Sequence, residues 1–311
     1  MHAQACLLPE SGNPQGRIRM SLPSLPLLCS LTVALNAHAD SPQIAADLPC
    51  SPFRWSALGE HARAAIKVPL QIDGTMHEFQ LDTGAFHSVI GSKDDWADAR
   101  LSIDGKSATL HDVQIGGNSL PTLQVFKHPS KPHEATLGLA ALLGKHVLID
   151  YPGERFCLID ETHWPAGLDE AIEWLPLTLD GGHLYLSLSA AGQTLPKVMF
   201  DTGSSLFPLV VDANLWHQLT GLRDPEQASQ RIDGHAWGKP ISVFGAPLRG
   251  ALELGSTKYD APLVYFQQDR NLGESYPGIQ GITGNALVWD SPVVLRLAGD
   301  ALALGILRTP Q

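Results

Sequence analysis

The chain has few cysteines and little positive charge. Only four of its 311 residues are Cys, and two of these, Cys6 and Cys29, lie close to the N-terminus. Lys and Arg number 21 against 32 Asp and Glu, which gives a net charge of −11. An acidic balance of this kind argues against nucleic acid or an anionic membrane as a partner.

Several common site signatures are absent as well. The sequence contains neither the Gly-x-Ser-x-Gly elbow of serine hydrolases nor the His-Glu-x-x-His pair of zinc peptidases. Its 13 His form no His-x-x-x-His pair beside the cysteines, so neither a metal nor another cofactor is expected. Beyond the N-terminal region, no apolar run approaches the roughly 20 residues that cross a bilayer. We therefore expect no membrane span.

The N-terminal region carries a processing signal. Behind two arginines, an apolar stretch that begins at Met20 ends in the small-x-small pattern Ala-His-Ala at 37–39. We expect residues 1–39 to be a signal segment that is removed and residues 40–62 to form an N-terminal segment. The mature protein is then exported, to the periplasm or the exterior.

Removal of the signal segment leaves two cysteines. Export places Cys50 and Cys157 in an oxidising compartment, where a pair of cysteines is expected to form a disulfide. The same removal leaves 19 basic and 31 acidic residues, so the acidic character of the mature chain is retained.

Three blocks of sequence occur twice, in the same order. Residues 79–91 match 198–210, residues 112–126 match 251–265, and residues 137–158 match 283–304. The offset between the copies grows from 119 to 139 to 146 residues, so the second copy carries insertions of 20 and 7 residues. Such a repeat indicates two copies of one structural unit. We divide the mature chain into a first lobe, 63–165, and a second lobe, 166–311.

Most segments within each copy alternate between apolar and polar residues. The stretches 65–73, 183–190 and 293–306 show this period of two and are bounded by Gly-rich turns, as is typical of antiparallel strands. Short helices are expected at 92–100, 135–143, 169–175 and 212–219. The sequence thus predicts a mostly β, bilobal fold in which two duplicated lobes enclose a central cleft.

The first repeated block contains the residues best suited to chemistry. An apolar strand ends in Asp82-Thr83-Gly84 in one copy and in Asp201-Thr202-Gly203-Ser204 in the other. If the lobes pack face to face, the two carboxylates meet and share one proton, because two nearby charges repel. One can then act as a base on water and the other as an acid. Gly permits a close approach of the loops, and the Thr hydroxyl can bond across to the opposite loop.

These motifs resemble those of the aspartic peptidases, both the pepsin-like single-chain enzymes and the retropepsins. Each loop is followed by a hydrophobic-hydrophobic-Gly element, at 136–138 and 282–284, and the likeness spans about residues 63–307. The resemblance implies the catalytic pair Asp82 and Asp201, with active-site loop support from Thr83, Gly84, Thr202, Gly203 and Ser204.

The function implied is that of a monomeric, exported aspartic endopeptidase that cleaves peptides or unfolded proteins with water. The alternative is a protein of the same fold that binds peptides without cleaving them. Pepsin-like enzymes cover the cleft with a first-lobe hairpin that carries a tyrosine, and the corresponding segment 102–112 has none. Either this hairpin works differently, or the segment 231–245 covers the cleft with Trp237.

The two loops also differ after their glycine. The residue there is Ala85 in the first copy and Ser204 in the second. In the family this position can donate a hydroxyl hydrogen bond to its own carboxylate, which favours the charged form. We therefore expect Asp201 to hold the negative charge and Asp82 the shared proton.

Overall fold

The computed structural model describes residues 48–93, 96, 102, 105–129, 134–236, 239–268 and 270–307. The expected signal segment 1–39 and Trp237 lie outside the described residues. Strands form most of the regular structure in these ranges. None of the helices found there is long and apolar enough to cross a membrane.

One sheet belongs to the first half of the chain. In the described ranges it has seven strands in the order β2-β3-β4-β8-β5-β7-β6. Their bounds are β2 Arg54–Leu58, β3 His61–Ile72, β4 Thr75–Asp82, β5 Ser88–Gly91, β6 Ser107–Ile115, β7 Asn118–His128 and β8 Ala135–Gly138. The alternation in the sequence sets the faces, since Ile66, Val68 and Leu70 of β3 are fully buried while Gln71 is exposed.

A second, ten-stranded sheet belongs to the second half. Its order among the described residues is β16-β17-β20-β15-β21-β14-β13-β18-β19, with β12 paired to β13. Their bounds are β12 Thr178–Asp180, β13 His183–Ala190, β14 Gln193–Phe200, β15 Leu209–Val210, β16 Gln230–Ala236, β17 Lys239–Pro247, β18 Ala251–Leu254, β19 Thr257–Asp260, β20 Leu263–Gln267 and β21 Gly281–Thr283. Two α-helices accompany this sheet, α1 Ala213–Thr220 and α2 Leu272–Ser275.

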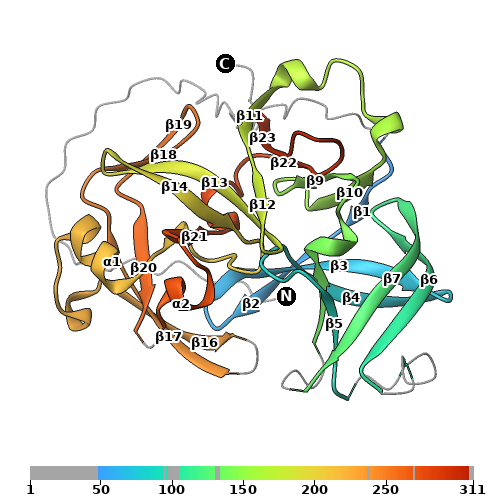
Figure 1. The fold of residues 1–311 in the computed structure, drawn as a ribbon, viewed down its shortest axis with the longest axis horizontal. Coiled ribbons are helices and arrows are strands. Elements are labelled where there is room, and N and C mark those ends of the chain that lie inside the picture. The colour runs from blue at the N-terminus through green and yellow to red at the C-terminus, as the bar shows by residue number, and fades with distance from the viewer. Residues whose placement is uncertain are drawn as a thin grey trace, which may run out of the picture. The chain divides into compact units, whose positions relative to one another are not determined.

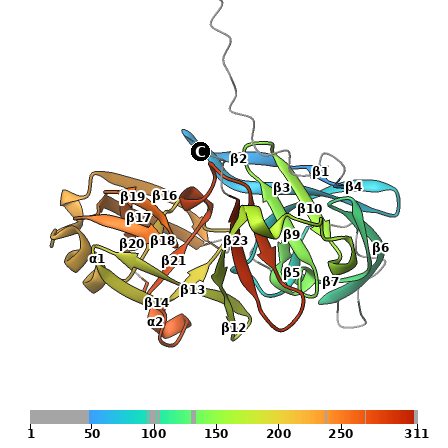
Figure 2. The same ribbon diagram turned by 90° about the horizontal axis from the view of Figure 1, so that it is seen from above.

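A third sheet joins the two halves. Its six described strands run in the order β1-β10-β9-β22-β23-β11, and β9 from the first half pairs with β22 from the second. Their bounds are β1 Ser51–Pro52, β9 His146–Asp150, β10 Arg155–Ile159, β11 Ile172–Pro176, β22 Val293–Arg296 and β23 Ala303–Leu307. Figures 1 and 2 show the first sheet in blue to green and the second in yellow to orange, with β22 and β23 between them.

The two lobe sheets repeat one unusual pattern of strand pairing. In the first lobe β4 pairs with β8 in parallel, β5 pairs with β7 in parallel, and β5 pairs with β8 antiparallel. In the second lobe β14 pairs with β21, β15 with β20, and β15 with β21, in the same three senses. The chain is thus mostly β and bilobal, with two lobes that repeat one pattern of strand pairing.

The expected helices are only partly present. Residues 212–219 form α1, as the sequence predicts. Residues 135–143 instead form β8 and a single 3-10 turn, and residues 169–175 form a 3-10 turn and β11. Both of these helix predictions are wrong, because these segments complete sheets through pairing with strands distant in the sequence. Most of 92–100 lies outside the described residues.

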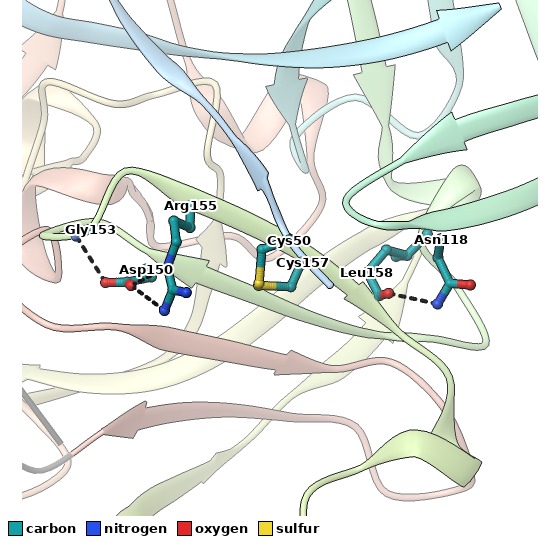
Figure 3. Close-up of a disulfide and its surroundings, with 7 residues drawn as sticks. All are labelled: Cys50, Asn118, Asp150, Gly153, Arg155, Cys157 and Leu158. Atoms are coloured by element: carbon teal, nitrogen blue, oxygen red, sulfur yellow. Dashed lines mark hydrogen bonds and ion pairs between the residues drawn. A yellow bond between two sulfur atoms is a disulfide. The ribbon is translucent and has the colours of Figure 1, made fainter. Parts of the chain in front are cut away.

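The predicted disulfide is confirmed. Cys50 and Cys157 are bonded, with their Cα atoms 4.3 Å apart, and Cys157 is completely buried. Figure 3 shows the bond beside the turn between β9 and β10, where the Asp150 carboxylate accepts a hydrogen bond from the Gly153 N–H at 3.0 Å. The bridge spans 107 residues and fixes the N-terminal segment to the joining sheet.

Loss of this bridge should destabilise the protein. A crosslink over so long a loop removes denatured-state freedom worth on the order of 4 kcal/mol. We expect the Cys50→Ser/Cys157→Ser variant to unfold at lower urea concentration than the wild type, by about that free energy. Reductant should lower the wild-type midpoint and leave that of the variant unchanged. Equal midpoints for the oxidised wild type and the variant would contradict the expectation.

Candidate active site

Two equivalent loops meet where the lobe sheets face each other. Asp82 is the last residue of β4, and Asp201 follows the last residue of β14. Each aspartate directly follows a buried apolar residue, Leu81 in β4 and Phe200 in β14, so each carboxyl group projects from a fixed strand end. Packing of the two strand ends thus brings together two residues 119 positions apart in the sequence.

The two carboxyl groups are in direct contact. A side-chain hydrogen bond joins Asp82 and Asp201. Oδ1 of Asp201 also accepts hydrogen bonds from the N–H of Gly203, at 2.8 Å, and from the N–H of Gly84 in the other lobe, at 3.1 Å. Oδ1 of Asp82 accepts one from the N–H of Ala85 at 3.0 Å. Backbone donors therefore replace the water that both groups lose on folding.

The two threonines lock the loops to one another. The N–H of Thr83 donates to Oγ1 of Thr202, and the N–H of Thr202 donates to Oγ1 of Thr83, both at 3.0 Å. The Thr83 hydroxyl in turn donates to the carbonyl oxygen of Phe200 at 2.9 Å. Both threonines have no exposed surface. These reciprocal bonds set the register between the lobes.

Each glycine of the loops faces the carboxyl group of the other lobe. A Cβ atom on Gly84 would lie 2.4 Å from Cγ of Asp201, and one on Gly203 would lie 2.6 Å from Cγ of Asp82. Any side chain at either position would therefore displace a carboxyl group. Glycine is required here by close approach, as the sequence suggests.

Asp82 and Asp201 share one proton between them. Burial, followed by the negative charge of Asp82, raises the pKa of Asp201 far above its ordinary value, and the backbone hydrogen bonds from Gly203 and Gly84 offset only part of this rise. The expectation that Asp201 holds the charge stays a prediction, because a coupled pair titrates as a unit. Its basis was a hydroxyl bond from Ser204, and in the described structure Asp201 accepts backbone N–H bonds instead.

Ser204 supports the loop through its backbone. Its N–H donates to the carbonyl oxygen of Asp201 at 3.0 Å and closes the turn after the strand. Its own carbonyl oxygen would lie 1.8 Å from a Cβ atom on Gly284, so only glycine lets the segment 282–284 pass behind the loop. In the first lobe a Cβ atom on Gly138 would lie 2.5 Å from the backbone carbonyl carbon of His87, so glycine is required there too.

Sequence reasoning missed Asn285, which sits directly behind the second loop. This fully buried side chain donates from Nδ2 to the carbonyl oxygen of Thr202 at 2.9 Å and to the Ser205 hydroxyl at 2.8 Å. Its Oδ1 accepts a hydrogen bond from the Tyr151 hydroxyl of the first lobe at 2.7 Å. A signal for it was present, since the first copy has an apolar residue, Leu139, after the equivalent glycine.

His183 was missed as well. It begins β13, and its imidazole lies close enough to Asp82 for that charge to raise its pKa, although burial has the larger effect and lowers it. The ring packs edge-on against Tyr276, with 5.0 Å between ring centroids. No local motif marks this residue, because Asp82 is 101 positions away.

A cleft opens above the two aspartates. Its volume is about 570 Å³, within the range of small-molecule and peptide sites. The first lobe contributes small and polar residues such as Ala64 and Gln80, whereas the second contributes larger apolar residues such as Phe207 and Ile241. The two walls therefore differ in character although the lobes are duplicated.

Two hairpins extend along the cleft. Ile232, Gly234 and Ile241 of the β16–β17 hairpin line it. The alternative that Trp237 covers the cleft stays a prediction, because this residue lies outside the described ones. A Cβ atom on Gly234 would lie 3.2 Å from Cδ2 of Leu58, at the tip of the β2–β3 hairpin. Among the described residues of 102–112, none lines the cleft.

The described residues offer no evident metal site. Among them, no three His, Cys, Asp or Glu side chains are grouped as a bound metal ion would need.

Comparisons with known proteins are distant. No protein-family model matches the chain, and no curated protein matches it. The solved structures that are similar include basic 7S globulin from soybean, with a TM-score of 0.45 and 11% identity over 85% of this chain and 95% of that chain. Another is conglutin gamma, a basic 7S globulin from lupine seeds, with a TM-score of 0.44 and 11% identity over 84% and 94%. Similarity at this level carries no inference about what this chain binds or does.

The threonine bonds give the first prediction from this site. Thr202→Val keeps the shape of the side chain but leaves the buried N–H of Thr83 without an acceptor, a loss of about 1–3 kcal/mol in the free energy of unfolding. Thr202→Ser keeps the hydroxyl and should cost less. Urea unfolding of both variants measures the difference, and equal stabilities would show that the cross-lobe bond contributes nothing.

The raised pKa of Asp201 gives a second prediction, on the pH dependence of stability. The folded protein keeps a proton that the unfolded chain releases above its ordinary pKa of 3.8, so the contribution of this group to stability is greatest at low pH and is lost as pH rises toward about 8. The loss in that window is at most about 1.4 kcal/mol per pH unit. In Asp201→Asn this part of the slope should vanish, because the amide is neutral throughout.

Asp201→Asn can keep the hydrogen bonds of the site. An asparagine oxygen can accept the bonds from Gly84 and Gly203 while its NH₂ group donates to Asp82. The matched control is Asp260→Asn, whose side chain is 89% exposed, and which should keep the wild-type slope. If unfolding curves between pH 4 and pH 8 give Asp201→Asn the same slope as the wild type, the proton does not reside on this pair.

Proposed function

We propose that the chain is an aspartic endopeptidase that hydrolyses peptide bonds with water. The observation that carries this proposal is that Asp82 and Asp201 interact within the lining of the cleft, where burial and the charge of Asp82 raise the pKa of Asp201 so that the pair keeps one proton. A charged carboxylate is a base and a protonated one an acid, and peptide hydrolysis needs both at the same place. The reciprocal bonds of Thr83 and Thr202 support it, since they fix the pair in one geometry.

The reaction then follows from the positions of the protons. Asp82 takes a proton from a water molecule, whose oxygen attacks the carbonyl carbon of the peptide bond. Asp201 gives its proton to the carbonyl oxygen, so the intermediate is a neutral diol. When the C–N bond breaks, the nitrogen takes the proton from Asp82, and one diol hydroxyl returns a proton to Asp201. Both carboxyl groups thereby regain their starting states.

The substrate that fits is a peptide or a segment of unfolded protein. The cleft runs between the two hairpins, β2–β3 from one lobe and β16–β17 from the other, so a chain must enter it in an extended form. Edge strands of hairpins can also bond to the backbone of such a chain, and this type of contact does not depend on side chains.

The proposed location is outside the cytoplasm. The Cys50–Cys157 disulfide supports it, because such bonds persist in oxidising compartments. The apolar N-terminal stretch that ends at 37–39 points the same way.

A second candidate function uses the same cleft without catalysis. The observation that favours it lies in the first-lobe hairpin: the segment 102–112 has no tyrosine, and its described residues do not reach the cleft. A protein of this kind would bind extended peptides and release them intact.

Replacement of either aspartate separates the two candidates. For a peptidase we expect Asp82→Asn and Asp201→Asn each to lower kcat/KM by at least about 100-fold, because the base or the acid is lost. Asp260→Asn should retain wild-type activity. The measurement is cleavage of a mixed peptide library and of an unfolded protein, followed by mass spectrometry from pH 3 to pH 8. Binding of these peptides by the wild type without any cleavage would establish the second candidate instead.

A further inference from the structure

Arg270 is a cation in the cleft wall with no carboxylate partner among the described residues. It lies between β20 and α2, is partly buried, and lines the cleft. Its NH2 group donates a hydrogen bond to the Tyr276 hydroxyl at 3.3 Å, and its guanidinium carbon lies 5.6 Å from the centre of that ring. Within the described part of the chain it forms no ion pair. A guanidinium has five N–H donors, so most of its bonding capacity is left for a ligand.

The other cation of the cleft is placed differently. Lys67 of β3 lies on the first-lobe wall, and its charge acts on Glu78 of the neighbouring strand β4. Glu134, which precedes β8, adds a carboxylate to the same wall. The first-lobe wall thus carries charges of both signs, whereas the described contacts of the Arg270 side chain are with Tyr276.

Tyr276 links Arg270 to the aspartate pair. One side of the tyrosine contacts the guanidinium, and its ring also packs against His183, with 5.0 Å between ring centroids. His183 is in turn close enough to Asp82 to respond to its charge. Arg270 is therefore separated from the pair by two side chains. The two ring contacts along this route are 5.6 and 5.0 Å long, and an extended peptide advances about 3.3 Å per residue, so together they correspond to about three residues of a bound chain.

We propose that Arg270 makes the cleft selective for peptides that carry an Asp or Glu side chain within about three residues of the bond to be cleaved. A guanidinium binds a carboxylate through two parallel hydrogen bonds, and partial burial strengthens them. The tyrosine holds the guanidinium in place, which reduces the entropy lost on binding. The net charge of −11 disfavours acidic peptides at long range, so the preference must arise from this local contact.

The position of the preferred side chain relative to a cleaved bond rests on the proposed function, but the test of the preference measures binding alone. The full mature chain with Asp201→Asn is used, so that peptides are not consumed. The probes are a series of ten-residue peptides with acetylated and amidated ends. Each contains a single Glu, at a different position in each peptide, as its only carboxylate. Each is paired with the same peptide in which Gln replaces that Glu. Dissociation constants are measured by fluorescence anisotropy at low and high salt.

We expect Glu to be preferred over Gln only at a few adjacent positions of the peptide. There the Glu peptide should bind about ten-fold or more tightly than its Gln partner, as hydrogen bonds to a charged group allow. Adding Arg270→Gln should abolish this preference and leave binding of the Gln peptides unchanged. Arg270→Lys, which keeps the charge but not the fork, should retain part of it. Arg223→Gln, an exposed arginine outside the cleft lining, is the matched control and should retain all of it.

Each outcome bears on one hypothesis. Equal binding of Glu and Gln peptides at every position, or a preference that survives Arg270→Gln, overturns the role of Arg270. If the preference depends on Arg270 but the wild type cleaves no peptide, the peptidase proposal fails and Arg270 remains a specificity residue of a binding cleft. If the wild type cleaves, the cleavage sites should lie within about three residues of the preferred Glu position.

Discussion

The structure depends on the contact between two carboxyl groups at a buried junction of two lobes. Such a contact opposes folding, because both groups lose water and repel each other when both are ionised. The proton that the pair shares removes the repulsion, and the N–H groups of Gly84, Gly203 and Ala85 replace the lost water. These donors can come close enough only because glycine leaves room for the opposite carboxyl group. The loop sequence follows from this one constraint.

Relative placement of the lobes is therefore as important as the loops. Besides the threonine pair, the bond between Tyr151 and Asn285 crosses the junction, and β9 pairs with β22 along its length. At the edge of the junction, the Arg63 guanidinium lies 5.6 Å from the ring of Trp55 and 5.2 Å from that of Trp289, which come from different lobes. A shift of one lobe would break buried hydrogen bonds in several places at once. The pair is thus held by the whole junction.

Much of this arrangement could be predicted from the repeat. Matched blocks imply matched strand pairings, and a pair of cysteines in an exported chain implies a disulfide; both are present. The helix predicted at 135–143 failed for a physical reason. A Cβ atom on Gly138 would lie 2.5 Å from the backbone of His87, so the segment must pass behind the loop as a strand. Leu- and Ala-rich composition favours a helix, but pairing with β4 and β5 decides the outcome.

Features that the two copies do not share could not be predicted in this way. The 20-residue insertion of the second copy falls between its first two blocks, and the β16–β17 hairpin beside the cleft lies there. The 7-residue insertion falls between the last two blocks, where α2, Arg270 and Tyr276 lie. Duplication thus accounts for two equivalent aspartates, which alone would form a symmetric pair on the floor of a symmetric cleft. The inserted segments make one wall different from the other, and a peptide has a direction that only an asymmetric cleft can recognise.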